Sequence, residues 1–500
     1  MLHISDAEWA ARLLSKANLG DVRRNKRCET VVSAMLQHPG KSLLTAACGH
    51  EGRRELFYRY ARSEHVDPTE LLAAGCTATA QDILDMAPEE EILLIGDTTT
   101  LGYRHCVRDE LGLTGSSKDA HKRGWIVHTI LAVCAKTSET LGPIEQFWWM
   151  RPPEEFGKRS KDKTRCYDEK ESFKWEASAC SSLQRLSEIY RNLVFVTDRE
   201  SDIYEYLVHL HGEDMRYVIR NCSNRRTKDE YFRVWEHCLA QPVLCDLALE
   251  MPQKGGRPSR VATLAMRVAC ITVRPPKDVE GSQPCITTYS ITLDEITPPE
   301  GIEPIRWVLF TSENVLENMN AAIKVVTWYS RRWRIEEYHR FWKSEGMRVE
   351  DLRMSTAENL QRVAVLQSFV ACPLMRLRDS AVPPISRLSI VKIHKAPPDM
   401  ETKTCIDAST MDFGDRPCTE LLTTVEWNIL WMATEKSTPP ILPPSRRWAS
   451  YAVAKLGGWF DSKRTGRPGY RAYIMGWLCF AERCEAFSDF CMLRTIHLEM

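Results

Sequence analysis

The chain is 500 residues long, and its 67 lysines and arginines balance its 67 aspartates and glutamates, so its formal net charge is zero. This length predicts about three domains, and the balance excludes a protein drawn to nucleic acid by its overall charge. No run of about 18 apolar residues could span a bilayer, no secretory signal opens the sequence, and the 18 cysteines lack zinc-binding spacing. We expect a cytoplasmic protein with reduced thiols and no membrane partner.

Residues 1–70 show the apolar spacing of short amphipathic helices, which we expect at 7–17, 27–37 and 53–62. Basic side chains gather between and after the first two helices, at Arg23, Arg24, Lys26, Arg27 and Lys41. Short helices with local positive charge are typical of a small DNA-binding domain. An ordinary helical N-terminal domain would show the same pattern, so this segment by itself leaves both interpretations open.

Residues 71–240 change to a mixed pattern of strands and helices. Four apolar runs predict buried strands, at 92–95, 125–133, 141–150 and 193–196. Helices are expected near 170–190 and 202–211. Strands followed by alternating helices and strands indicate a mixed α/β (α+β) layer fold.

The second half of the chain divides by composition into three parts. Residues 241–313 are β-rich with Gly/Pro turns, which we interpret as an all-β insertion. Residues 314–376 return to helix. From 377 onward, proline pairs mark a linker that leads into a helical C-terminal domain ending at 500. The apolar face of that domain needs a partner, either the rest of the chain or a second copy.

One predicted helix, over 329–343, carries an unusual set of polar side chains. At about 100° per residue, Tyr329, Arg332, Glu336 and Lys343 fall within an arc of roughly 60°. A carboxylate between two cations suits a metal ion bound to a phosphodiester. A solvated face with charge pairs would look the same. Glu337 lies about 100° round the helix from Glu336 and so points off this face.

Two further carboxylates follow buried strand runs. Asp97 comes after 92–95, and Asp198 comes after 193–196. A carboxylate at such a place is costly unless it is paired or binds a metal, although a strand-end Asp is more often a turn or cap residue. Together with Glu336 they form three acids from three elements. Such oxygen ligands suit two Mg²⁺ or Mn²⁺ ions about 3.5–4 Å apart.

The chain resembles DDE transposases of the bacterial IS-four family. It carries the family's Tyr-x₂-Arg-x₃-Glu-x₆-Lys signature at Tyr329, Arg332, Glu336 and Lys343. Further matching words lie, in the family's order, at 97–99, 103–105, 123–125, 148–152, 168–175, 198–200, 252–255, 307–313 and 456–466. The resemblance therefore runs over almost the full length of the chain.

The resemblance implies a fold and a set of metal ligands. It implies an RNase H-like core in two parts, at 71–240 and 314–376, separated by the β insertion at 241–313. It also implies a DNA-end-binding domain at 1–70 and a C-terminal dimerisation domain within 377–500. By the same resemblance, Asp97, Asp198 and Glu336 would hold two Mg²⁺ ions.

The resemblance also implies DNA contacts. Tyr329, Arg332 and Lys343 would hold backbone phosphates, and Trp307 would stack on a base flipped from the duplex. The other expected DNA contacts are Arg220, Arg199, Trp333 and the N-terminal basic residues. A plain strand Trp in the core is the alternative for Trp307. The chain departs from the family pattern at Cys222 and Asn224, which puts one phosphate contact in doubt; Arg225 and Arg226 could replace it.

The reaction that the resemblance implies is cut and paste. Water attacks the transposon end, the freed 3′ hydroxyl forms a hairpin with the opposite strand, a second water opens it, and the 3′ end attacks target DNA. The expected partners are double-stranded DNA, both transposon ends and target, and a second copy of the chain in a synaptic complex in the bacterial nucleoid. An RNase H-like nuclease without strand transfer and an inactive, DNA-binding repressor are the alternatives.

Overall fold

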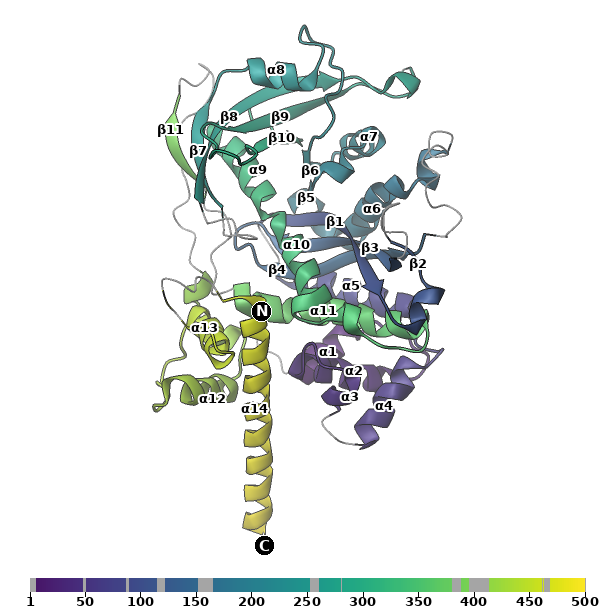
Figure 1. The fold of residues 1–500 in the computed structure, drawn as a ribbon, viewed down its shortest axis with the longest axis vertical. Helices are drawn as coiled ribbons and strands as arrows, with labels where there is room; N and C mark the ends of the chain where they lie inside the picture. The colour runs from purple at the N-terminus through teal and green to yellow at the C-terminus, as the bar shows by residue number, and fades with distance from the viewer. Residues whose placement is uncertain are drawn as a thin grey trace.

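The structure is a computed structural model that describes residues 6–47, 51–86, 90–114, 122–151, 165–251, 260–279, 281–379, 388–394, 413–460, 462 and 468–499. The motif segments 252–255 and 463–466 lie outside these residues. Figure 1 shows a β-rich lobe, a central sheet crossed by helices, and a helical part from which one long helix projects. Among the helices described, none is long and apolar enough to cross a membrane.

A single mixed sheet organises the described residues. Its strands are β1 (Ile92–Tyr103), β2 (Gly112–Leu113), β3 (Arg123–Cys134), β4 (Thr140–Trp149), β5 (Leu193–Thr197), β6 (Arg216–Arg220), β7 (Cys245–Met251), β8 (Arg260–Val273), β9 (Ile286–Glu295), β10 (Arg306–Thr311) and β11 (Leu388–Ile393). The spatial order is β11-β7-β8-β9-β10-β6-β5-β1-β3-β2, and β4 also pairs with β3. Only β1–β5 and β5–β6 are parallel pairs. This central mixed sheet with its helices fits the expected RNase H-like core.

The strands predicted for 241–313 do form, and they continue the core sheet. β7, β8, β9 and β10 are joined in antiparallel register, and β10 then pairs with β6 of the core. In Figure 1 they fan out as the upper lobe, with α8 (Val234–Ala240) across them. The ladder from β10 to β6 makes the β-rich segment an extension of the core sheet.

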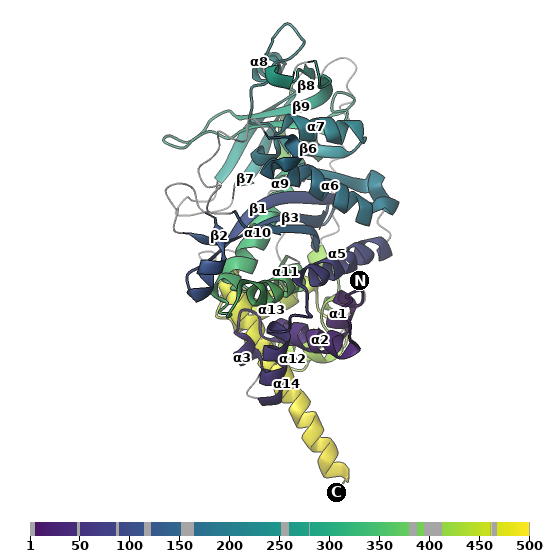
Figure 2. The ribbon, with the colours of Figure 1, turned by 90° about the vertical axis from the view of Figure 1, so that its right-hand side faces the viewer.

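Helices cover both faces of the sheet and form the N-terminal and C-terminal parts of the chain. They are α1 (Asp6–Leu13), α2 (Val22–Gln37), α3 (Leu43–Ala46), α4 (Glu51–Ala61), α5 (Pro68–Asp85), α6 (Lys174–Arg185), α7 (Tyr204–Gly212), α9 (Met319–Arg331), α10 (Trp333–Arg340), α11 (Ala357–Asp379), α12 (Thr424–Glu435), α13 (Arg446–Leu456) and α14 (Tyr470–Glu499). Helices α6 and α7 lie on one side of β1 and β3, and α9 and α10 on the other, as Figure 2 shows. The buried apolar side chains beside the sheet accordingly form two clusters, and a third cluster lies among α12, α13 and α14 in the described residues.

The basic run at 23–27 differs from the prediction. It was expected between two helices, but it forms the first turns of α2, because the Asp21 side chain accepts a hydrogen bond from the Arg23 N–H and caps the helix early. One basic residue is used inside this domain, since Arg24 donates to the carbonyl of Leu19 at 2.6 Å.

The predicted helix over 329–343 is broken in two places. Arg332 interrupts it between α9 and α10, with short-range bonds from Arg332 N to Tyr329 O and from Ile335 N to Arg332 O. After α10 the chain widens into a π-helical turn, Phe341–Glu345, which contains Lys343. Such a turn adds backbone length within a helix and is frequent at functional sites. The spacing of 100° per residue is therefore not kept as far as Lys343, whose position depends on this turn.

The helical C-terminal part packs against the rest of the chain. Helix α14 contacts α13, and the Trp477 indole on α14 donates to the carbonyl of Leu36 on α2 at 2.9 Å. Beyond this contact the helix projects from the body with exposed Phe487 and Phe490. The segment predicted as a linker contributes β11, which pairs with β7 at the edge of the sheet, so this part of the linker prediction is wrong.

Candidate active site

The two aspartates lie side by side on neighbouring parallel strands. Ile95 of β1 is in register with Val196 of β5, so Asp97 and Asp198 stand at the same level two residues later. Side chains alternate across a strand, and Ile95 and Val196 both belong to the core beneath α9, α10 and α11. The two carboxylates therefore point to the face of the sheet on which α10 lies.

Asp97 is not at a strand end, contrary to the prediction. β1 continues to Tyr103, and Asp97 pairs with Thr129 of β3. The antiparallel partner β3 is longer than the parallel partner β5, which ends at Thr197. Asp97 therefore stands where the parallel ladder ends, although its own strand continues. Asp198 does follow the end of its strand, at the start of the 3₁₀ turn Arg199–Ser201, as predicted.

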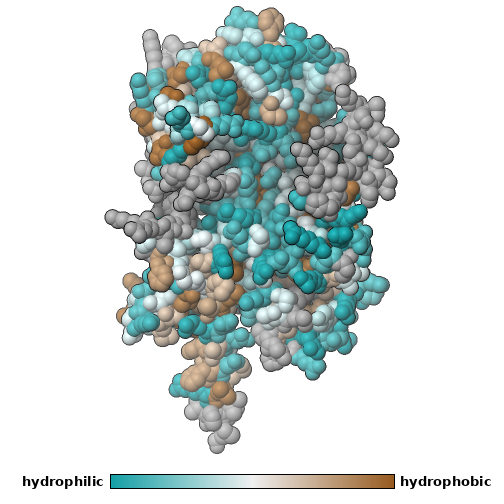
Figure 3. Space-filling model, viewed as in Figure 1, coloured by the Kyte–Doolittle hydropathy of each residue, from teal (hydrophilic) through white to brown (hydrophobic). Residues whose placement is uncertain are grey.

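Glu336 on α10 is linked to Asp198 through Arg332. The Arg332 guanidinium donates to the Glu336 carboxylate at 2.5 Å and lies 3.7 Å from the Asp198 carboxylate. One cation thus bridges the helical acid and the strand acid. Figure 3 shows hydrophilic surface over the middle of this face, where α10 crosses the sheet. Glu337, by contrast, is buried on the other side of the helix, as predicted.

His339 is a site residue that the sequence analysis missed. Its Nδ1 lies 3.6 Å from the Asp97 carboxylate, and its ring is buried. A helix brings residues three apart onto one face, so the Glu336-x-x-His339 spacing was the available signal. Burial alone would raise the pKa of Asp97, but His339, Arg332 and the Thr98 N–H outweigh it and hold that pKa below its ordinary value.

The carboxylates fit divalent cations in chemistry, although they are not gathered as a finished site. Two aspartates and a glutamate are hard oxygen donors of the kind that Mg²⁺ and Mn²⁺ prefer. In the part of the chain that the structure describes, no three His, Cys, Asp or Glu side chains are close enough together to hold a metal. Arg332 stands between Asp198 and Glu336 instead, and its charge occupies a place that a cation could take. A metal there would require this side chain to turn away.

Lys343 reaches the same face of the sheet from the π-helical turn. Its ammonium lies 3.4 Å from the Thr99 hydroxyl, two residues beyond Asp97, and 3.5 Å from the Glu350 carboxylate. Glu350 also accepts from the Gly102 N–H at 2.8 Å, which fixes its position against β1. Lys343 is therefore beside the acids, but part of its charge is balanced within the protein.

Tyr329, Trp307 and Arg220 form a second group at the end of α9. The rings of Trp307 and Tyr329 meet edge to face with centroids 5.0 Å apart. Arg220 lies beside the Tyr329 hydroxyl and donates to the carbonyl of Arg306 at 3.0 Å. Burial raises the pKa of Tyr329. Trp307 is only partly buried, so it is neither a fully enclosed core residue nor a free ring.

The remaining predicted DNA contacts are spread over the molecule. Arg199 is exposed beside Asp198, and Trp333 is half-buried at the start of α10. Arg23, Lys26 and Lys41 are exposed on the N-terminal domain, which α11 separates from the sheet in Figures 1 and 2. The structure therefore does not bring the N-terminal basic residues to the three acids.

The fold is a mixed α/β sheet covered by helices. At the end of its parallel ladder, Asp97 and Asp198 lie on the face covered by α10, which carries Glu336. Residues 6–66 match a family model described as transposase DNA-binding, and residues 177–372 match one described as transposase DDE domain. The second match includes Asp198 and Glu336 and begins after Asp97. The two matches support a DDE-type transposase, which binds DNA and cleaves it by phosphoryl transfer.

Proposed function

We propose that this chain is a cut-and-paste transposase of the IS-four family, similar to the Tn-five transposase. The observation that carries the proposal is the meeting of Asp97, Asp198 and Glu336 around one face of the sheet, with Arg332 between two of them. Each acid comes from a different element. Asp97 and Asp198 stand level on neighbouring strands, and Arg332 joins Asp198 to Glu336. Carboxylates brought to one face of a sheet in this way are costly unless they are paired or bind a ligand, which favours a functional site.

Asp97, Asp198 and Glu336 would hold two Mg²⁺ or Mn²⁺ ions. Such ions would activate the attacking water or 3′ hydroxyl and stabilise the leaving oxygen of an in-line displacement. The acids' own task is to stay ionised and oriented, which the contacts of Asp97 with His339 and the Thr98 N–H favour. Every step of the family reaction is a phosphoryl transfer, so one site can serve cleavage, hairpin formation, hairpin opening and strand transfer.

The surrounding side chains would position the DNA. Lys343 and Arg332 offer cations on either side of the acids for the phosphates that flank the scissile bond. Tyr329, with Arg220 beside it, would contact the next part of the backbone. Trp307 would stack on an unpaired base at the transposon end, which is worth about 1–3 kcal/mol.

The other parts of the chain would recognise and join the ends. Arg23, Lys26 and Lys41 on the N-terminal domain would bind the terminal inverted repeat. The projecting part of α14 would pair two copies in a synaptic complex, because its apolar side chains are exposed in the single chain. In the bacterial cell we place this complex at the nucleoid.

The test is to incubate the purified chain with DNA carrying its element's own end and flanking sequence, with Mg²⁺, and to separate products on a denaturing gel. We expect hairpinned ends. Asp97→Ala, Asp198→Ala and Glu336→Ala should abolish cleavage while binding of end DNA survives, and Asp109→Ala, an exposed carboxylate in another turn, should behave as wild type.

Each alternative has its own result in this experiment. Nicked ends without hairpins would indicate a nuclease that does not join strands. Retarded DNA without any cleavage would indicate a repressor. Normal excision by any one of the three alanine variants would refute the assignment of the acids.

A further inference from the structure

The turn that carries Asp198 is closed by its own side chains. Asp198 is the first residue beyond β5, so the strand ladder no longer holds its backbone. The Ser201 hydroxyl donates to the Thr197 hydroxyl at 2.5 Å and contacts the Asp198 carbonyl at 2.8 Å. The Asp198 carboxylate accepts from the Glu200 N–H at 3.1 Å. These contacts shape the turn, but they do not fix it to the rest of the site.

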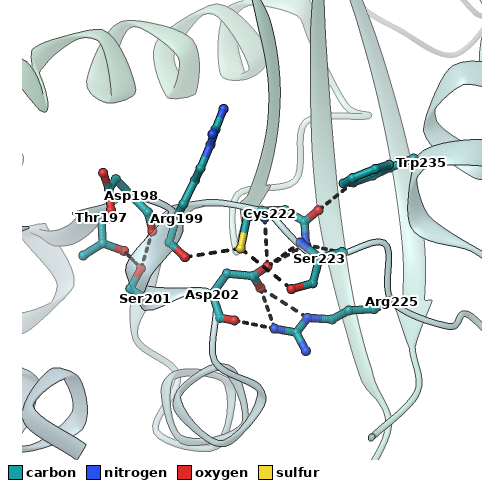
Figure 4. A network of polar contacts seen from close by, with 10 residues as sticks. Thr197, Asp198, Arg199, Ser201, Asp202, Cys222, Ser223, Arg225 and Trp235 are labelled. Atoms are coloured by element: carbon teal, nitrogen blue, oxygen red, sulfur yellow. Dashed lines mark hydrogen bonds and ion pairs between the residues drawn. The ribbon is translucent and has the colours of Figure 1, made fainter. Parts of the chain in front are cut away.

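Asp202, the residue after this turn, connects it to the loop after β6. Figure 4 shows its carboxylate at the centre of the polar network. One oxygen accepts from the backbone N–H groups of Cys222 and Ser223, at 2.9 and 3.0 Å, and from the Asn221 amide at 3.1 Å. The other accepts from two nitrogens of Arg225, at 2.8 and 3.2 Å. The Asp202 side chain has 0% exposure, so five donors replace its water.

The loop at 221–225 belongs to the same edge of the sheet as Asp198. β5 and β6 are parallel, with Thr197 in register with Ile219, so the segments that follow them leave the sheet together. Arg220, an expected DNA contact, immediately precedes this loop. The Cys222 thiol also lies 3.4 Å from the Arg199 carbonyl, within the Asp198 turn. Asp202 thus joins the turn that bears Asp198 to the end of β6, where Arg220 is an expected DNA contact.

This arrangement assigns Arg225 to the protein interior. The sequence left it open whether Arg225 and Arg226 replace a phosphate contact that the family has at this loop. Arg225 is nearly buried and bound twice to the Asp202 carboxylate, and it also donates to the Asp202 carbonyl at 2.5 Å. Arg226 donates to the carbonyl of Pro275 at 2.9 Å. Arg225 is therefore the counter-ion of Asp202.

We infer that Asp202 is a positioning residue for the phosphoryl-transfer site: it sets the Asp198 carboxylate relative to the β6 loop and to Asp97. This inference rests on the proposed function. Removing a residue that orients a metal ligand typically weakens metal affinity or lowers activity by about 10–100-fold. The effect should appear in metal binding and in the chemical step, and leave end-DNA binding unchanged, because Asp202 itself is out of reach of DNA.

A matched control is available in the same region. Asp229 also accepts several hydrogen bonds, from the Thr227 hydroxyl, the Tyr231 N–H and the His237 ring, at 2.8, 3.1 and 2.7 Å. No contact joins it to the Asp198 turn among the described residues' hydrogen bonds. Asp202→Asn and Asp229→Asn therefore each remove one charge from a carboxylate that accepts several hydrogen bonds, and only Asp202 contacts the loop beside the Asp198 turn; the Asp229 side chain is 23% exposed, against 0% for Asp202.

The experiment measures three quantities for each full-length variant: Mn²⁺ binding by calorimetry without DNA, the single-turnover cleavage rate, and the dissociation constant for end DNA. For Asp202→Asn we expect Mn²⁺ binding at least about 10-fold weaker and cleavage at least about 10-fold slower, with the DNA dissociation constant within about twofold of wild type. Asp229→Asn should match wild type in all three. Arg225→Lys keeps the charge but loses the bidentate contact with Asp202. It should weaken Mn²⁺ binding and slow cleavage in the same way, but by a smaller factor, and it replaces Asp202→Asn as the test if that variant does not fold.

The inference is overturned if Asp202→Asn and Arg225→Lys bind Mn²⁺ and cleave as wild type does, or if Asp229→Asn loses as much as Asp202→Asn. Asp198→Ala separates this failure from failure of the proposed function. An Asp198→Ala protein that still cleaves refutes the function itself, whereas an inactive Asp198→Ala beside a normal Asp202→Asn refutes only the positioning role.

Discussion

Two adjacent glutamates on α10 should respond in opposite ways to removal. Glu337 lies in a buried cluster of two cations and two anions, in which Arg334 contacts Glu337 at 3.0 Å and Asp379 at 2.8 Å. Arg378 lies 3.6 Å from both acids and 3.8 Å from the ring centroid of Tyr470, the first residue of α14. The cluster thus joins α10 to α11 and to the C-terminal helix α14.

Glu337→Ala leaves this cluster with one uncompensated positive charge. Burial alone would lower the pKa of Arg334, but Asp379 and Glu337 outweigh it and raise that pKa, so the guanidinium stays charged. Removing one partner of a buried pair typically costs 3–5 kcal/mol, at least about 3 here because the Glu337 side chain is only 5% exposed. The Glu336 side chain is 33% exposed, so Glu336→Ala should lower the free energy of unfolding by no more than about 1 kcal/mol.

The assay is urea unfolding of the wild type, Glu336→Ala and Glu337→Ala, followed by fluorescence. At a slope of about 2–3 kcal/mol per molar urea, the expected loss lowers the Glu337→Ala midpoint by about 1–2 M. Glu336→Ala should unfold within a few tenths of a molar of the wild type, yet be inactive. Since several domains unfold, the midpoints are compared directly and no single unfolding free energy is assigned.

A double variant separates charge from packing. Glu337→Met combined with Arg334→Met removes one charge of each sign and keeps similar volume, so it should recover much of the lost stability. Equal urea midpoints for Glu336→Ala and Glu337→Ala would refute the reasoning, because the two residues would then share one environment. A double variant less stable than Glu337→Ala would show that packing, not charge, explains the loss.

Two further predictions concern charge and pH. Lys343→Ala should reduce the steepness of log affinity for end DNA against log salt concentration by about 0.9, the value for one phosphate contact. Lys324 pairs with Glu91 near the start of α9, so Lys324→Ala should leave this slope unchanged. An unchanged slope for Lys343→Ala would show that Lys343 holds no phosphate. Burial would raise the pKa of Glu139, but Arg376 and Arg446, at 2.7 and 3.4 Å, hold it below its ordinary 4.5. The stability that ionised Glu139 contributes is therefore complete above pH 4.5 and is lost as the pH falls through the lowered pKa. Glu139→Gln should be less stable than the wild type at pH 7 and should lose less stability on acidification. Parallel curves of stability against pH for the two proteins would contradict this.

The linear sequence was sufficient to predict most of the buried strands and to single out the three acids. Apolar runs at 92–95 and 193–196 can only be buried on both faces, which is why both strands were predictable. The period of two along each strand, and the period of 3.6 along α10, are local properties. The helical period alone places Glu336 and Glu337 on different faces of α10, without any knowledge of the residues that each one contacts.

Local periodicity failed where a neighbour decides the geometry. The end of β1 depends on the length of β3, so Asp97 was wrongly placed at a strand end. The π-helical turn contains Lys343, whose ammonium lies beside Thr99 of β1, and a regular helix projection cannot anticipate such a turn. The joining of β10 to β6 is a pairing between strands about 90 residues apart, which no short pattern encodes.

By itself, then, the sequence determined which residues are candidates for the chemistry: three acids, a helix with cationic side chains and a basic N-terminal segment, because residue type and local period can be read directly from the chain. Only the tertiary structure decided how they meet. The level register of Asp97 with Asp198, the bridge made by Arg332, the contact of His339 with Asp97 and the Asp202 network all join segments distant in sequence. Such contacts depend on strand register and on how the helix packs on the sheet, and these are properties of the whole fold.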